Sequence, residues 1–94
     1  MERANSLTQC CAPGCRTMKA AHLLMCFVHW SCLPQNIKER VHAGHRKMQD
    51  GESARDWLIA RELARLHIAV RTLQPQAIQD EIEAEIERLE AVQL

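Results

Sequence analysis

Apolar residues recur with helical spacing through the second half of the chain. The clearest run recurs every three or four positions: Ile59, Leu63, Leu66, Val70 and Leu73. This spacing places them on one face of an α-helix. Ser53 is suited to cap its first free amides, and Pro75 disfavours helical geometry at Gln74. The pattern therefore predicts a helix that begins after Ser53 and ends at Gln74.

A second helix is predicted upstream of this one. It begins at Ser31–Pro34 and runs to about Met48, and Gly44 is expected to weaken it locally. Its apolar residues again follow helical spacing: Leu33, Ile37, Val41 and Met48. Only a short turn separates the two helices, so we expect an antiparallel hairpin.

A third helix is predicted from about Gln76 towards the C-terminus. Its apolar stripe lies on an otherwise acidic helix: Ile78, Ile82, Ile86, Leu89 and Val92. Such a stripe is expected to dock on the protein's own body or on another chain. We therefore take four of its residues as a candidate interaction surface: Ile78, Ile82, Ile86 and Leu89. Homodimerisation through residues 76–94 is a hypothesis.

The N-terminal third carries all five cysteines, between positions 10 and 32. Two of them flank the turn-forming Ala12-Pro13-Gly14, and a Cys-x2-His pair follows after ten intervening residues. Two short-spaced pairs are the usual way to hold one zinc ion. The predicted ligands are Cys11, Cys15, Cys26 and His29. Four protein ligands leave no position for a reactive water, so the ion is expected to be structural.

The ligand assignment has open alternatives. Cys10 competes as the first ligand, and Cys32 competes as the fourth. The cysteines could instead be buried as small apolar side chains, although a core would scatter them along the chain. A disulfide framework is disfavoured by the odd number of cysteines.

Composition supports a mainly α fold for this chain of 94 residues. Hydrophobic residues make up 47% and aromatic residues 3%, which favours helices over a sheet. We expect a zinc knuckle or treble-clef-like site, then the helical hairpin, then an amphipathic helix. The expected divisions are a flexible N-terminus at 1–10, a zinc-clipped helical domain at 11–74 and an acidic helix at 75–94.

The chain lacks the apolar signals of membrane insertion or secretion. The longest apolar run, Ala20 to Val28, is too short to cross a bilayer. The first nine residues have no signal-peptide core. We therefore expect a cytoplasmic protein in a reducing compartment, where clustered cysteines more often bind metal than form bridges.

Charge is divided along the chain although the total is zero. Residues 1–75 carry 11 Lys and Arg against 6 Asp and Glu, whereas residues 76–94 carry one Arg against six acids. The basic helices at 38–47 and 55–71 make nucleic-acid binding an alternative function. Its candidate residues are Lys38, Arg46, Lys47, Arg61 and Arg65. The same charges are also typical of a solvated helix face.

Enzymatic activity is the least favoured function class. His42 and His45 share a helix face and could hold a second metal or act as bases. Neither a Ser-His-Asp set nor a phosphate-binding loop can be found in the sequence.

The string from Met25 to Trp30, followed by Leu33-Pro34, resembles small zinc-binding proteins encoded by bacteriophages and prophages. The resemblance covers roughly residues 11 to 73, and its most specific part is CxxHWxxLP. It implies one bound zinc and a phage or prophage origin. With the apolar stripe at 78–92, it favours a protein-interaction module that binds and modulates a host or phage protein, for example as an inhibitor of host defence.

Overall fold

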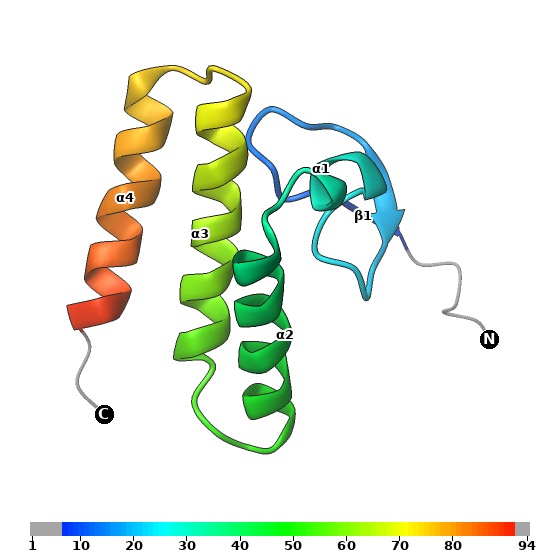
Figure 1. The fold of residues 1–94 in the computed structure, drawn as a ribbon, viewed down its shortest axis with the longest axis vertical. Helices are drawn as coiled ribbons and strands as arrows, with labels where there is room; N and C mark the ends of the chain where they lie inside the picture. The colour runs from blue at the N-terminus through cyan, green and yellow to red at the C-terminus, as the bar shows by residue number, and fades with distance from the viewer. Residues whose placement is uncertain (1–6, 92–94) are drawn as a thin grey trace.

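The computed structural model describes residues 7–91, which form four helices and a small antiparallel sheet (Figure 1). The elements in chain order are β1 (Leu7–Gln9), β2 (Met18–Ala20), α1 (Phe27–Ser31), α2 (Gln35–Gln49), α3 (Arg55–Arg71) and α4 (Gln76–Ala91). The predicted mainly α fold, with an N-terminal Cys/His cluster ahead of the helices, is confirmed.

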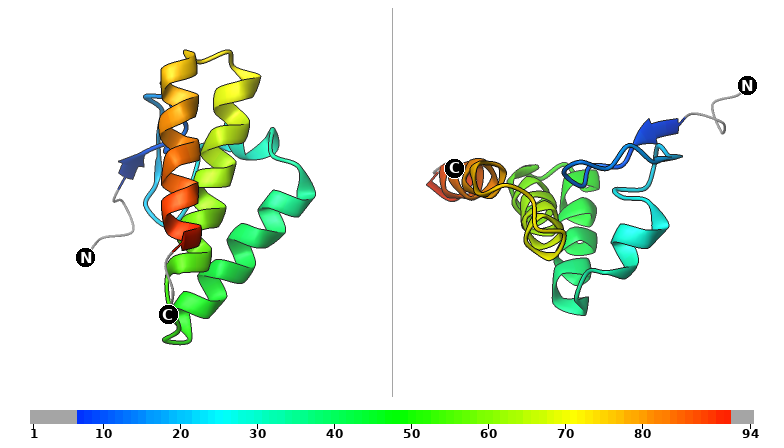
Figure 2. Two further views of the ribbon diagram at one scale, coloured as in Figure 1. Left: turned by 90° about the vertical axis from the view of Figure 1, so that its left-hand side faces the viewer. Right: turned by 90° about the horizontal axis from the view of Figure 1, so that it is seen from above.

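Helix α3 is the centre of the structure. Figures 1 and 2 show α4 on one side of α3 and the N-terminal segment on the opposite side. Its most buried residues are Ala60, Ala64, Ile68 and Ala69, each with 0% exposure. Three of these are alanines, whose small side chains let neighbouring elements approach the helix closely. Ala64 and Ile68 pack towards the cysteine cluster, whereas Ala69 packs towards α4.

The antiparallel pairing of α2 and α3 is as predicted, but Gly44 has a different part in it. A Cβ atom at Gly44 would lie 2.7 Å from both the Cα and the N atom of Trp57. The backbones of the two helices therefore approach more closely here than any other residue would permit. Gly44 was expected only to weaken α2, whereas the structure places it at the contact with α3.

Helix α4 packs its apolar stripe on α3. Ile82, Ile86 and Leu89 are all buried, and the first two share a core cluster with Ala69. The candidate interaction surface at Ile78, Ile82, Ile86 and Leu89 is therefore corrected, because within the described residues it is largely covered by the protein's own α3. Val92, the last predicted residue of the stripe, lies outside the described residues.

The segment Leu7–Cys10 is ordered, which corrects the expectation of a flexible N-terminus over 1–10. β1 pairs with β2 in antiparallel register, with Thr8 opposite Lys19. The pairing continues one step further, because the Cys10 amide donates to the Thr17 carbonyl at 2.9 Å. Three-residue strands give little hydrophobic signal, so the local pattern did not reveal them. Residues 1–6 lie outside the described range.

The start of α2 also differs from the prediction. Ser31 ends the short helix α1, and α2 begins at Gln35 with Pro34 as its N-cap residue. The reason is a tight turn after α1, in which the Cys32 amide donates to the His29 carbonyl at 3.0 Å.

Within residues 7–91, no helix has both the length and the apolar character that a bilayer crossing requires.

Candidate metal centre

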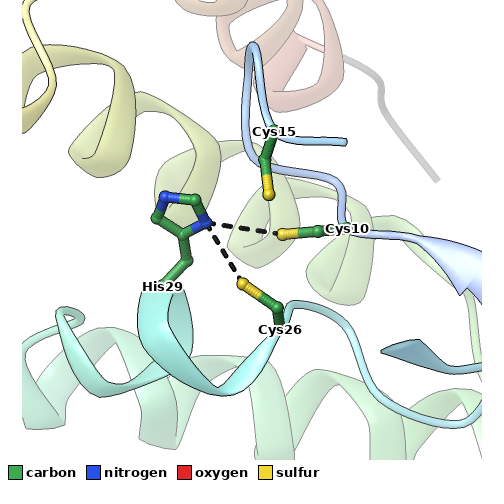
Figure 3. Close-up of side chains that lie close together, drawn as sticks. All are labelled: Cys10, Cys15, Cys26 and His29. Atoms are coloured by element: carbon green, nitrogen blue, oxygen red, sulfur yellow. Dashed lines mark hydrogen bonds between the residues drawn. The ribbon is translucent and has the colours of Figure 1, made fainter. Parts of the chain in front are cut away.

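Four side chains converge between the N-terminal loop and α1: Cys10, Cys15, Cys26 and His29. Their ligand atoms all lie within 4.8 Å of one another. Figure 3 shows the three sulfur atoms and one ring nitrogen of His29 pointing towards a common centre. Cys10 and Cys15 come from the loop between β1 and β2, whereas Cys26 and His29 come from the start of α1. Two distant segments are therefore brought together at this cluster.

The first pair is positioned by a tight turn. The Cys15 amide donates to the Ala12 carbonyl at 3.1 Å, and Gly14 in the turn has a φ of 80°. Proline at the second position and a positive φ at the third are typical of a type II turn. Pro13-Gly14 thus returns the chain so that Cys15 joins Cys10 in the cluster, whereas the sequence predicted that this turn would bring Cys15 to Cys11.

The second pair is positioned by a single helical turn. Cys26 is the N-cap residue of α1, and its carbonyl accepts a hydrogen bond from the Trp30 amide at 3.0 Å. Residues three apart lie on the same face of a helix, so His29 lies beside Cys26. The Cys26 side chain does not cap the helix, which leaves its sulfur free to face the cluster.

The distances within the cluster fit a tetrahedral metal site. The Nδ1 atom of His29 lies 3.4 Å from the Cys26 sulfur and 3.7 Å from the Cys10 sulfur. Metal–sulfur bonds of about 2.3 Å and metal–nitrogen bonds of about 2.0 Å place such ligand atoms about 3.5 Å apart in a tetrahedron. The residues present therefore fit a single ion held by three sulfur atoms and one imidazole.

The protonation of the thiols depends on their surroundings. Burial raises the pKa of the Cys10 thiol to about 11, because a thiolate is poorly solvated there. A hydrogen bond with the Thr17 side chain lowers the pKa of the Cys15 thiol. A divalent cation at the cluster would stabilise all three thiolates by its charge. The Cys10 thiolate is thus disfavoured by burial unless a positive charge lies beside it.

Cys10 takes the place in the cluster that the sequence assigned to Cys11. Cys10 and Ala12 are 4% and 3% exposed, whereas Cys11 between them is only half-buried. In extended backbone, alternate residues point the same way, so Cys10 and Ala12 face inward together. No local pattern in the sequence distinguished Cys10 from Cys11, because this alternation follows from the pairing of β1 with β2. Cys32, the alternative fourth ligand, lies at the C-cap of α1 outside the cluster.

An ion pair between buried Glu62 and partly exposed Arg65 ties the cluster to α3. Arg65 donates through Nε to the Cys11 carbonyl at 2.9 Å and through its guanidinium to Glu62 at 2.7 Å. Glu62 is only 5% exposed, and a buried carboxylate requires such a partner. The sequence had placed Arg65 on a basic surface and gave Glu62 no function. The spacing of three residues on one helix was the only available signal.

Most of the proposed nucleic-acid residues have partners within the protein. Lys38 lies 5.8 Å from the centre of the Trp30 ring, and Lys47 pairs with Asp56 at 2.7 Å. The guanidinium of Arg61 lies 5.9 Å from the Trp57 ring centre, and Arg65 holds Glu62. Arg46 is exposed in the last turn of α2. Four of the five candidate residues therefore have a partner within the described part of the protein.

No protein-family model, curated protein or solved structure matches this chain significantly. The resemblance to zinc-binding phage proteins therefore stays a prediction from the sequence. The geometry of the cluster and of the surface around it is what bears on function.

Replacing Cys10 with Ser is expected to disrupt metal binding, whereas replacing Cys11 with Ser should leave it intact. The reason is that only Cys10 places its sulfur within the cluster. Cobalt(II) titration reports this directly, because the thiolate-to-cobalt absorption falls when one of the thiolates is lost. Cys32→Ser is the matched control and should behave like the unchanged protein. If the Cys10→Ser variant and the unchanged protein gave equal cobalt spectra, the assignment of Cys10 as a ligand would be contradicted.

Proposed function

We propose that this chain is a small, non-enzymatic protein-interaction module stabilised by one structural zinc ion. The observation that carries the proposal is a pair of exposed apolar side chains between two of the ligand residues. Phe27 is 82% exposed and Val28 is 66% exposed, while Cys26 and His29 on either side of them join the cluster. The site would hold this apolar turn in a fixed position for a partner to bind.

The donor set supports zinc as the ion. Three sulfurs and one imidazole are soft or borderline ligands, and zinc takes them in tetrahedral sites. All four positions are supplied by the protein, so the ion would have no open position for a substrate. Its contribution would be to the order of the N-terminal segment and not to chemistry. Five cysteines, all free, fit a reducing compartment such as the cytoplasm.

The exposed apolar residues support a protein partner. Surface apolar side chains that stand alone are ordinary, but contiguous ones mark interaction sites. Phe27 and Val28 are adjacent in α1, and Leu23 nearby in the chain is 47% exposed. Phe27 is also the chain's single phenylalanine, and aromatic residues are enriched in binding hot spots. A solvated helix face has no need of such residues.

The origin and partner of the module follow from the sequence resemblance alone. The CxxHWxxLP string supports a phage or prophage origin, in which the partner would be a host or phage protein. An inhibitor of host defence is one such role. The alternative of nucleic-acid binding has less support, because Lys38, Lys47, Arg61 and Arg65 are engaged within the protein.

Selection from a displayed library of random peptides tests the function. The zinc-loaded full chain is expected to enrich peptides that no longer bind the Cys26→Ser variant, because the apolar turn loses its support without the ion. Duplex and single-stranded DNA are tested in parallel across a salt series. Steeply salt-dependent DNA binding, with no peptide enriched, would show that the function is nucleic-acid binding instead.

A further inference from the structure

A largely apolar groove lies between the segment that follows β2 and helix α2. One wall includes Leu23, Met25 and Phe27, and the other includes Val41 and Met48 of α2. Met25 and Val41 are buried at 2% and 6% exposure, while Leu23 and Phe27 are exposed at the groove. The groove therefore has a closed apolar base and an open apolar edge, which is the form of a docking surface.

The α2 wall presents a helical row of side chains. Val41, His45 and Met48 line the groove at positions i, i+4 and i+7 of α2, so they lie along one face of that helix. Rows of this kind receive the side-chain ridge of another helix. An occupant that lies along α2 as a helix would contact this row and the edge at Phe27 together.

The groove is lined by cationic and neutral groups. Besides the thiol of Cys11, its ionisable lining residues are Lys19, His22, His42 and His45. Among the described residues, no Asp or Glu lines it. An acidic occupant would be attracted to this lining, and a basic one would be disfavoured beside Lys19.

We propose that this groove binds an acidic amphipathic helix of a partner protein. The apolar face of that helix packs on Leu23, Phe27 and Met48. Its carboxylates face Lys19 and the histidine side chains. Helix α4 of a second copy has the right composition but cannot serve, because Ile82 and Ile86 are already buried on α3. The occupant is therefore a different protein.

This docking depends on the metal and rests on the proposed function. Leu23 lies three residues before Cys26, and Phe27 lies between Cys26 and His29. Ligand residues therefore hold this wall of the groove in place. The α2 wall belongs to the helical hairpin and has its own core. Loss of the ion would therefore displace one wall and leave the other in place.

A biased helix library tests the charge and the location together. Displayed helices carry a constant leucine stripe, with polar positions randomised among acidic, basic and neutral residues, and are selected on the zinc-loaded full chain. We expect acidic residues to be enriched over basic ones by on the order of tenfold. The proposal would be overturned if the selected helices were basic, if their enrichment did not depend on charge, or if no helix were enriched.

Variants of the groove edge then locate the site. Leu23→Ser and Phe27→Ser are each expected to weaken the selected helix about tenfold, and both residues are exposed, so the fold should persist. Lys19→Glu should weaken binding of the selected helix more at low salt than at high salt. Val70→Ser is the control, because Val70 is 53% exposed on α3 and does not line the groove.

The outcomes separate this proposal from the proposed function. If Phe27→Ser weakens the binding of random peptides to the zinc-loaded chain but Leu23→Ser and Lys19→Glu do not, the interaction module stands and the groove assignment is wrong. If neither library yields a binder and DNA binds, both proposals fail.

Discussion

Removing the metal is expected to unfold residues 7–33 while the hairpin α2–α3 and helix α4 remain helical. Structural zinc contributes about 10–16 kcal/mol in isolated zinc-finger peptides, which is more than the whole stability of many domains. Without the ion, the sheet that would have to hold the N-terminal segment consists of two three-residue strands. A hairpin of this kind is marginal in water. Its packing on Ala64 and Ile68 would not compensate for three uncoordinated thiols.

Nuclear magnetic resonance during chelator titration measures this loss. Amide resonances of residues 7–33 should collapse towards random-coil positions, while far-ultraviolet circular dichroism keeps most of its helical signal. Cys26→Ser should reproduce the chelated spectrum, because it removes one of the four ligand residues. Re-addition of zinc after chelation is the control for damage by the chelator. A metal-free protein with unchanged N-terminal resonances would show that the cluster is held together without an ion.

Replacing Gly44 with Ala is expected to destabilise the protein by about 2–3 kcal/mol. In an isolated helix the same change would stabilise by about 1 kcal/mol, because glycine has the higher conformational entropy. Here the new Cβ would lie 2.7 Å from backbone atoms of Trp57. Backbone atoms cannot rotate away as a side chain can, so α2 and α3 would have to separate along their contact.

Urea denaturation of the zinc-loaded protein measures the effect as a lower midpoint with little change in slope. Arg46→Ala, at an exposed position two residues further along α2, is the matched control and should stay within about 0.5 kcal/mol of the unchanged protein. A stabilised Gly44→Ala protein would show that helix propensity outweighs the close contact and that the helices are further apart than the structure places them.

Both predictions concern features that the sequence identified in part. The cysteine cluster was recognised as a metal site from Cys15, Cys26 and His29, because the Pro13-Gly14 turn and the Cys-x2-His pair are local. The sequence prediction chose Cys11 as the first ligand instead of Cys10, and this was wrong. The choice between them depends on the pairing of β1 with β2. That pairing joins residues about ten positions apart and leaves no periodic pattern in strands of three residues.

The apolar stripe of a helix likewise does not show which surface the stripe packs against. The spacing of Ile78, Ile82 and Ile86 predicted a helix that must bury one face, and α4 does so. Whether it packs on α3 or on a second chain depends on the shape of α3. The fully buried Ala69 leaves the space on that side of α3 that Ile82 and Ile86 fill, and this complementarity exists only once the helices are assembled.

By itself, then, the sequence determined the three long helices, that their apolar faces must be covered, and that a Cys/His cluster forms near the N-terminus. These follow from short-range rules: helical periodicity, turn-forming residues and ligand spacing. The tertiary structure alone decided which cysteine faces the cluster, why α2 requires Gly44, and that α4 packs on α3. Each of these depends on contacts between residues far apart in the chain, whose geometry no local pattern contains.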